Sequence, residues 1–440
     1  MRRWRARSAL LALALALVAC APPTPRSGIR ARLAAFARPN LVLIVVDTLR
    51  ADRVTPYGFE ANTSPELARW AEHGALFENA LAQSSWTKIS MASLLTSLWP
   101  RSHGIREVRD GLGDAAQTVA EVLHDAGYRT YAVQTNGWLD QSFGFQQGFD
   151  RYVFPSGRGA NLPRPSVWPH VDRVVDEATR LLEAHDAAAP FFLYLHFMDV
   201  HEYAAPPEFK RFGSDAAGAY LAAVAWVDDG IRRVRTALES TGLAGRTAIV
   251  FASDHGESLG EHGVQGHARD LRAPVLHVPL VIRFPFPIEP VRVAAQVRDL
   301  DIAPTLLELA GVAVPASFEG ESLLPLITGE AAPEGRKSYA ALGAPLYPDS
   351  AVQAAIAESG WSYARRLAPD ARAGEEWLFD RRVDPGENVD LALREPEALS
   401  RLRARLDAHL AAPPRPGVAK REVHIDPSIA ERLRAMGYLQ

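Results

Sequence analysis

The sequence predicts an α/β fold, with a mainly parallel β-sheet flanked by helices and a smaller C-terminal α+β subdomain. Four short apolar runs, the first of them rich in β-branched residues, have the pattern of strands covered on both faces. Segments with helical periodicity lie between them, and strands that alternate with helices form mainly parallel sheets. The chain of 440 residues is long enough for one large domain and a smaller one.

The predicted strands and helices alternate along the first three quarters of the chain. Strands are expected at residues 40–46, 191–197, 247–253 and 278–284. Helices are expected at residues 65–73, 117–126 and 171–184. The first of these helices has Ser64 as a candidate N-cap, Pro65 at its first position and Gly74 as a stop signal.

The periodicity changes after about residue 330. Residues 331–440 contain short strand-like pieces, a turn-rich segment at 384–387 and a helical stretch at 395–410. Residues 39–330 are therefore expected to form the main domain, and residues 331–440 a C-terminal subdomain.

The N-terminus has the features of an export signal. Four arginines among the first seven residues precede an apolar run at 9–19, which is too short to span a bilayer. The run ends in Leu17-Val18-Ala19-Cys20, which resembles the lipobox of bacterial lipoproteins, and Cys20 is the only cysteine. Residues 1–20 are therefore interpreted as a lipoprotein signal peptide, with Cys20 as the acylated residue. The alternative is a buried thiol at the end of an uncleaved apolar segment.

The residues after Cys20 predict where the mature protein would be held. No aspartate follows the cysteine, and the resemblance then implies lipid anchoring at the outer membrane of a Gram-negative bacterium. Residues 21–38 are rich in Pro and Arg and are expected to be a tether without regular structure.

The charge of the chain argues against a nucleic-acid partner. The net charge is -4 and the pI is about 6.4. Such a chain has no basic stripe to neutralise a phosphate backbone.

Acidic and imidazole side chains follow two of the predicted strands. Asp47 ends the first strand, and Asp254-His255 follows the strand at 247–253. Ligands in open α/β sheets bind at the carboxyl ends of strands, so these residues could converge on one ion such as Mg, Mn, Ca or Zn. The structural alternatives are that the aspartates cap helices and that the histidine is a satisfied surface group.

A hydroxyl lies directly ahead of a helix in the segment 84–96. Ser90 is expected to cap that helix. The N-terminus of a helix offers N–H groups and the positive end of a dipole, which suit a tetrahedral anion.

The chain resembles the sulfatase family of the alkaline-phosphatase superfamily over nearly all of residues 39–440. The matching blocks, in order, are Asp47-Thr-Leu-Arg-Ala-Asp52, the segment containing Thr87, Pro100-Arg-Ser-His-Gly104, His196-Phe-Met-Asp-Val-His201, Ser253-Asp-His-Gly-Glu257, Glu261-His-Gly263, Gly266-His267, Asp301-Ile-Ala-Pro-Thr305, Leu378-Phe-Asp380, Asp384-Pro-Gly-Glu387 and Met436-Gly-Tyr438. The resemblance implies an alkaline-phosphatase-like fold and one divalent metal ion held by Asp47, Asp254, His255 and Thr87.

The chain departs from the family at the nucleophile. Sulfatases have Cys or Ser, followed by x-Pro-x-Arg, and oxidise the Cys or Ser to formylglycine. The aligned residues here are Thr87, Ile89 and Met91. Oxidation of a threonine hydroxyl would give a ketone, so no formylglycine is expected. The resemblance to phosphoethanolamine and phosphoglycerol transferases implies a threonine alkoxide instead.

Two further departures concern the metal. Thr48 stands where many sulfatases have a second aspartate, and His255 where many have asparagine. Loss of a negative charge weakens Ca binding, and an imidazole shifts the preference toward Mn or Zn. An Asp-His pair is shared with phosphonate monoester hydrolases and the phosphotransferases.

The resemblance also implies roles for further side chains. His201 and His267 are expected to act as a general acid or an anion clamp. Asn136 is expected to reach the anionic group of the substrate. Lys88 and Arg50 are candidate anion contacts or solvated charges, and His103 and His262 are candidate supporting or structural residues.

The sequence thus predicts a metal-dependent hydrolase that acts on a sulfate or phosphate-type ester of a small molecule, glycan or lipid, through a covalent intermediate on Thr87. One alternative is a phosphoethanolamine or phosphoglycerol type of transferase. Another is a binding protein that kept the fold and lost the chemistry, which the loss of the family's Pro and Arg at Ile89 and Met91 would favour.

Overall fold

The computed structural model describes residues 24–36, 38–155, 170–330, 336–343, 346–347, 350–367, 372–415 and 418–435. The predicted signal peptide with Cys20 and the tail block Met436-Gly-Tyr438 lie outside these residues. Within the described ranges, no helix is both long and apolar enough to cross a membrane.

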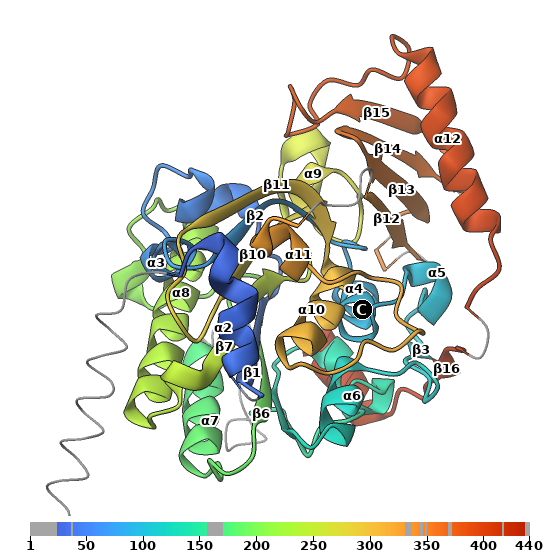
Figure 1. Cartoon of the computed structure of the whole chain (residues 1–440). Helices are drawn as coiled ribbons and strands as arrows, with labels where there is room; N and C mark the ends of the chain where they lie inside the picture. Colours follow the sequence, from blue (N-terminus) through green and yellow to red (C-terminus); the bar gives the residue numbers. More distant parts are fainter. Residues whose placement is uncertain are drawn as a thin grey trace, which may run out of the picture.

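The centre of the molecule is an eight-stranded sheet with the strand order β11-β2-β10-β7-β1-β6-β4-β5 (Figure 1). Its strands are β1 (Asn40–Val46), β2 (Ala75–Leu81), β4 (Arg129–Val133), β5 (Arg151–Val153), β6 (Phe191–Phe197), β7 (Thr247–Ser253), β10 (His277–Arg283) and β11 (Val291–Arg298). Only β10 runs antiparallel to its neighbours. The mainly parallel α/β fold is therefore confirmed.

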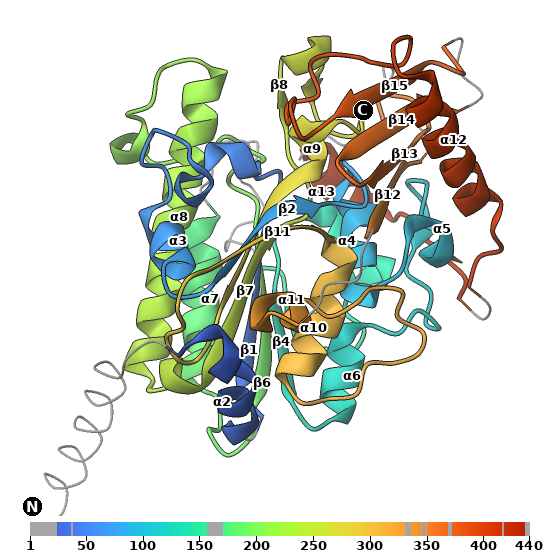
Figure 2. The same cartoon turned by 45° about the horizontal axis from the view of Figure 1, so that its top comes forward.

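Both faces of this sheet are covered, as its apolar strands predict. In β1, Leu41, Leu43 and Val45 belong to one hydrophobic core, and the alternate residues belong to another. The first core includes α4 (Thr87–Thr96), α6 (Val119–Asp125) and α10 (Ile302–Leu309), and the second includes α3 (Pro65–Ala71), α7 (Val171–Glu183) and α8 (Ala216–Ser240) (Figure 2). Burial of these two apolar layers is the main source of stability.

The predicted helices agree with α3, α6 and α7 to within two residues at each end. Ser64 is the N-cap of α3 by position, but its hydroxyl accepts a hydrogen bond from Thr55 instead of from the helix. The carboxylate of Asp228 on α8 accepts the backbone N–H groups of Glu66 and Leu67 at 2.9 and 3.0 Å. A tertiary contact therefore replaces the local cap.

Helix α8 is the longest helix in the described part of the chain and was not among the predicted elements. Its buried residues include Tyr220, Val224, Val227, Ile231 and Val234, at helical spacing. The N-cap Asp215 accepts the backbone N–H of Gly218. This spacing and this cap are signals that the sequence offers for the helix.

The C-terminal subdomain contains a separate four-stranded antiparallel sheet with one helix, as predicted (Figure 1). Its elements are β12 (Lys337–Leu342), β13 (Gln353–Glu358), β14 (Trp361–Arg366), β15 (Glu376–Asp380) and α12 (Pro396–Ala411). Leu402 and Leu406 of α12 pack on the sheet in a third apolar cluster.

The predicted boundary of this subdomain is wrong at its far end. Strand β16 (Arg421–Glu422) pairs with β3 (Asp110–Gly111) of the main domain. Helix α13 (Pro427–Ala435) also returns to the main domain, where Ile429 and Leu433 join the first core.

The prediction of an irregular tether at residues 21–38 is wrong for its described part. Residues Arg26–Gly28 form η1 and Ile29–Ala35 form α2. Thr24 forms a bridge with Ile288, and the Arg26 guanidinium donates to the Leu326 and Ile327 carbonyls. Ile29 and Leu33 are buried in the first core, so apolar contacts hold the segment to the domain.

The remaining described elements are short. They are η2 (Ala51–Arg53), η3 (Thr55–Tyr57), α5 (Pro100–His103), η4 (Gly137–Leu139), η5 (Gln141–Phe143), η7 (Pro207–Phe209), η8 (Ala244–Arg246), β8 (Ser258–Leu259), η9 (Glu261–Gly263), β9 (Gln265–Gly266), α9 (Ala273–Leu276), η10 (Asp299–Asp301) and α11 (Leu324–Thr328).

Candidate active site

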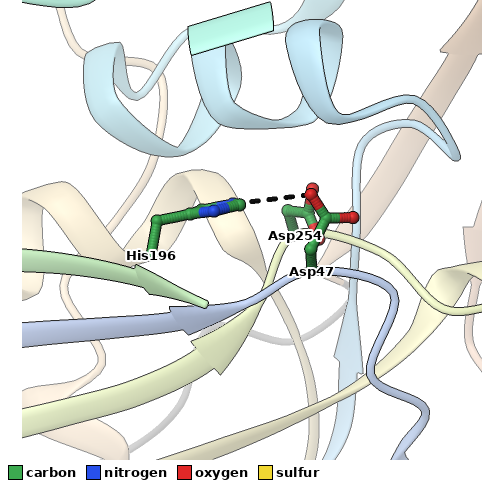
Figure 3. Close-up of side chains that lie close together, drawn as sticks. All are labelled: Asp47, His196 and Asp254. Atoms are coloured by element: carbon green, nitrogen blue, oxygen red, sulfur yellow. Dashed lines mark ion pairs between the residues drawn. The ribbon is translucent and has the colours of Figure 1, made fainter. Parts of the chain in front are cut away.

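Three neighbouring strands deliver polar side chains to the same edge of the large sheet. Asp47 follows β1, Asp254 follows β7, and His196 lies near the end of β6 (Figure 3). Each of these side chains is 0% exposed. The parallel strands bring them together because their carboxyl ends share this edge, as the sequence predicted for Asp47 and Asp254.

Thr87 reaches this edge as the first residue of α4. Its hydroxyl oxygen lies 3.4 Å from Asp47 Oδ2 and 3.2 Å from His255 Nε2. The positive end of the α4 dipole therefore lies beside the two carboxylates. The structure thus brings together Thr87, Asp47, Asp254 and His255, the four residues expected to share a metal ion.

The expectation that Ser90 caps this helix is wrong. The helix begins at Thr87 with Trp86 as N-cap, so Ser90 lies inside its first turn. The Ser90 hydroxyl donates to the backbone carbonyl of Asp254 and thereby ties α4 to the end of β7.

The ring of His255 is held in one tautomer. Its Nδ1 lies 2.9 Å from the Gly256 carbonyl, which can only accept a hydrogen bond, so Nδ1 carries the proton. The unprotonated Nε2 then faces the Thr87 hydroxyl and lies 3.4 Å from Asp254 Oδ2. This nitrogen can ligate a metal or accept a proton.

Asp47 and Asp254 each have a carboxylate oxygen without a hydrogen-bond partner among the described residues, which fits the binding of a cation. Within the described part of the chain, Asp47 Oδ1 and Asp254 Oδ2 are buried and have no hydrogen-bond partner. Burial raises the pKa of Asp47 to about 7, and the neighbouring Asp254 charge adds to this effect. Burial likewise raises the pKa of Asp254 to about 7. A divalent cation would satisfy both oxygens and keep both groups ionised.

His196 is a candidate ligand that the sequence analysis did not single out. Asp47, His196 and Asp254 place one ligand atom each within 4.8 Å of one another (Figure 3). Neither ring nitrogen of His196 has a hydrogen-bond partner among the described residues, and its Nε2 lies 3.7 Å from Asp47 Oδ2. A histidine inside an otherwise apolar buried strand was the available signal. The ion could therefore take its imidazole from His255 or from His196.

Asn136 reaches the centre but faces the protein instead of a substrate. Its amide nitrogen donates to Asp47 Oδ2 at 2.7 Å and lies 3.4 Å from the Thr87 hydroxyl. Its carbonyl oxygen accepts the backbone N–H of Trp138. These contacts orient Asp47 and Thr87, which differs from the predicted substrate contact.

Three imidazoles stand in a row beside Thr87. The His267 ring lies 4.9 Å from that of His255 and 4.8 Å from that of His201. Burial opposes protonation of His201, but Glu202 and Asp47 outweigh it and raise its pKa to about 9. Burial and the His201 charge lower the pKa of His267 well below its ordinary value. One cationic and one neutral imidazole therefore adjoin the centre, as an anion clamp and a proton-transfer group require.

Arg50 is not placed to bind an anion. Its guanidinium donates to both carboxylate oxygens of Asp52 at 2.8 Å and to Glu261 at 2.7 Å. The side chain is 5% exposed, so these partners leave it no open face. The predicted anion contact is corrected to a structural ion pair.

Lys88 also faces away from the centre. Its amine donates to the Val108 carbonyl at 2.8 Å and lies 3.8 Å from the centre of the Phe143 ring. Burial lowers the pKa of Lys88 well below its ordinary value. Successive helical residues point about 100° apart, so Lys88 turns away when Thr87 faces the site.

The two remaining histidines support the structure and do not touch the centre. His103 lies 3.2 Å from the Ser93 hydroxyl and accepts the Ile105 N–H, and burial lowers its pKa to about 3. His262 packs near Phe379 of the C-terminal sheet.

The backbone after Asp47 is strained. Thr48 has φ of 59°, a rare conformation for a β-branched residue. In this conformation its N–H points at Asp254 Oδ1 at 3.2 Å, and its carbonyl accepts the Tyr220 hydroxyl from α8. The strain therefore helps to orient a carboxylate of the centre.

Two protein-family profiles match most of the described chain. The sulfatase family profile matches residues 39–312, and the profile described as N-sulphoglucosamine sulphohydrolase, C-terminal, matches residues 260–412. An N-acetylglucosamine-6-O-sulfatase of Bacteroides thetaiotaomicron is 24% identical, over 72% of this chain and 74% of its own length. An arylsulfatase of Clostridium perfringens is 26% identical, over 66% of this chain and 78% of its own length.

Solved structures share the fold. One was determined in complex with its substrate, D-glucosamine-2-N,6-O-disulfate; it has a TM-score of 0.69 and 20% identity, covering 84% of this chain and 97% of that chain. The phosphonate monoester hydrolase of Agrobacterium radiobacter has a TM-score of 0.70 and 19% identity, covering 85% and 95%. The family profile spans more than half of the chain, and this protein therefore belongs to the sulfatase family of ester hydrolases, with the alkaline-phosphatase-like fold.

Proposed function

We propose that this protein is a metal-dependent hydrolase of a sulfate or phosphate-type ester, with Thr87 as a covalent nucleophile in place of formylglycine. The observation that carries this proposal is the position of the Thr87 hydroxyl, at the N-terminus of α4 and beside Asp47 and His255. A divalent ion held by Asp47, Asp254 and one imidazole, with Thr87, would lower the pKa of the hydroxyl and neutralise the attacked anion.

The chemistry of threonine requires two displacements. The Thr87 oxygen loses its proton, to His255 Nε2 if His196 serves the ion, and forms a bond to sulfur or phosphorus while the bond to the leaving alcohol breaks. The leaving oxygen takes a proton from the cationic His201. Water then attacks the same sulfur or phosphorus atom, and the bond to the Thr87 oxygen breaks. This second displacement is needed because threonine, unlike a formylglycine hydrate, has no second hydroxyl on the same carbon that could expel the anion.

The family relatives support a carbohydrate sulfate ester as the substrate class. A curated relative carries the name N-acetylglucosamine-6-O-sulfatase, and a structural neighbour was solved with a sulfated glucosamine. The cationic His201 provides the positive charge that a sulfate oxygen requires.

A phosphorus ester is the second candidate, and one observation favours it. The Asp254-His255 pair and Thr87 replace the Asn and the formylglycine precursor of sulfatases, and a phosphonate monoester hydrolase is a structural neighbour. A transferase would use the same centre and differ only in passing the group to an alcohol instead of water.

The experiment is a panel of 4-nitrophenyl sulfate, phosphate, phenylphosphonate and phosphodiester, tested on metal-loaded protein. The expected result is turnover of at least one ester, with a sulfuryl or phosphoryl mass increase on the Thr87 peptide after acid trapping. Turnover without any labelled Thr87 peptide, and with activity kept in Thr87→Ala, would disprove the covalent route.

We also propose that Cys20 is acylated and anchors the exported protein in the outer membrane of a Gram-negative bacterium. The support is the sequence motif and the absence of any other cysteine. Cys20→Ala should prevent acylation and move the protein from the membrane fraction to the soluble fraction. Continued membrane attachment of a processed Cys20→Ala protein would disprove the anchor.

A further inference from the structure

We infer that a cavity between the two sheets is a second anion-binding site, which holds a charged group of a polymeric substrate away from the reacting ester. The cavity measures about 490 Å³ and is lined by Arg336, Arg381 and Arg382 together with Asn79, Gln296 and Ser359. It is called the arginine pocket below. Its lining residues show that it lies where the edge strand β11 meets the C-terminal sheet. Figures 1 and 2 show the course of β11 and of that sheet.

A break in the edge strand makes room for the pocket. The pairing of β11 with β2 shifts register between Val293 and Gln296, and the intervening residues are the small Ala294 and Ala295. Asn79 donates to the carbonyl of Ala294, and Gln296 donates to the carbonyl of Ala357 in β13. These bonds hold the opening between the two sheets in a fixed shape.

The lining is positively charged. Three arginines and no carboxylate line the pocket among the described residues. The Arg336 guanidinium is fixed by Asp301 at 2.9 Å, and that of Arg382 by both oxygens of Asp380. Carboxylates thus hold two of the three guanidinium groups in fixed orientations, which reduces the entropy lost when an anion binds.

The buried side chain of Arg381 is an independent observation that indicates a ligand in the pocket. Its side chain is 7% exposed, and within the described chain its guanidinium has one ion pair, from Nε to Glu387 at 3.5 Å. Its Nε has no hydrogen-bond partner among the described residues. A buried guanidinium with an unmet donor is costly unless an anion or water satisfies it, and the planar guanidinium group suits the oxygens of sulfate or carboxylate.

The position of the pocket separates it from the catalytic centre. Strand β11 is four strands away from β1, or about 19 Å at the spacing of neighbouring strands. An anion in the pocket is therefore not the group under attack at Thr87. A chain with several anionic groups could occupy both places, which favours a polysulfated glycan over a small monoester. This choice of ligand rests on the proposed function.

The test measures binding of dextran sulfate, with unsulfated dextran as the reference polymer. Arg381→Gln/Arg382→Gln should weaken dextran sulfate binding roughly tenfold, because two charge-assisted contacts are lost. Arg382→Gln alone, at a half-exposed position, should weaken binding by a smaller factor and keeps the experiment informative if the double variant fails to fold. Arg292→Gln is the matched control, because it removes the same charge from β11 outside the pocket.

Turnover of the best small ester should be the same in all four proteins. Equal binding in Arg292→Gln and both pocket variants would overturn the inference, and so would a loss of small-ester turnover in the pocket variants. The binding assay needs no catalysis, so a failure of the proposed function would appear separately, as absent turnover in the unsubstituted protein.

Discussion

Two clusters of charged side chains include residues that closely follow β1. They differ in how many of their polar atoms have hydrogen-bond partners within the protein. In the Arg50 cluster, formed by Arg50, Asp52 and Glu261, every guanidinium nitrogen has a hydrogen-bond partner. In the proposed catalytic centre, formed by Asp47, Thr87, Asp254 and His255, two carboxylate oxygens have none among the described residues. Buried charge that is satisfied within the protein supports structure, and buried charge that is left unsatisfied indicates a ligand.

The largest expected effect is on Thr87. Thr87→Ala should lower turnover of any active ester by about four orders of magnitude, because it removes a covalent nucleophile. Thr87→Ser should keep part of the activity, since it retains the hydroxyl and loses only the methyl that restricts its rotamer. Steady-state kinetics with the ester panel provides the measurement, and near-native turnover by Thr87→Ala would mean that water attacks directly.

The second effect concerns the metal. Purified protein should contain about one divalent ion per chain, and Asp254→Asn should reduce this content to near zero. Elemental analysis after dialysis checks it. His255→Gln and His196→Gln, compared side by side, show which imidazole is the ligand, because only the ligand variant should lose metal. Metal retained in Asp254→Asn would contradict the assignment.

The two clusters should respond to pH with opposite sign. In metal-free protein, burial holds the pKa of Asp47 and Asp254 at about 7, whereas unfolded carboxyls ionise near about 4. The folded state then binds more protons in this window, so stability should fall as the pH rises from about 4 to about 7. Urea unfolding of chelator-treated protein measures this, and added metal should reverse the trend.

Asp52 provides the control for this prediction. Burial raises its pKa, but the hydrogen bonds and charge of Arg50 outweigh burial and lower it. Its stabilising contribution is therefore present above about pH 4 and is lost only at lower pH. Asp52→Asn should leave the fall between about pH 4 and 7 unchanged, whereas Asp254→Asn should reduce it; the reverse pattern would refute the comparison.

The smallest effect is expected for Arg50. Arg50→Met should lower the free energy of unfolding by about 2 kcal/mol, through the lost charge-assisted hydrogen bonds, and leave metal content intact. Chemical denaturation and elemental analysis measure the two quantities. A stable Arg50→Met protein with a raised KM would instead restore the predicted role of Arg50 as an anion contact.

The backbone of the centre was predictable from the sequence because it depends on strand ends. Apolar runs located β1, β6, β7 and β10, and the residue that follows a parallel strand lies at the ligand edge whatever the rest of the fold. Strands β2 and β11 were missed because each carries exposed or half-buried polar residues near the sheet edge. Their mixed composition is weak evidence for a strand.

The directions of individual side chains were less predictable. Arg50 follows Asp47 by three residues and Lys88 follows Thr87 directly, but Arg50 pairs with Glu261 from a distant loop, and Lys88 contacts a carbonyl and an aromatic ring. His196 was overlooked because one histidine in a strand gives no spacing pattern. Such partners are set by tertiary packing, which local sequence does not encode.

If Cys20 is acylated as proposed, the packing of residues 24–35 against the main domain would set the distance between that lipid and the proposed catalytic centre. At most about 14 Å of extended chain separates Cys20 from Thr24. Thr24 pairs with Ile288, which follows the antiparallel β10 and so lies at the amino ends of the parallel strands, opposite the catalytic edge. With the lipid inserted in the bilayer, this short connection would hold the amino-terminal edge of the parallel strands near the membrane. Thr87 would then lie a strand length farther from the membrane, accessible to substrates that diffuse in water.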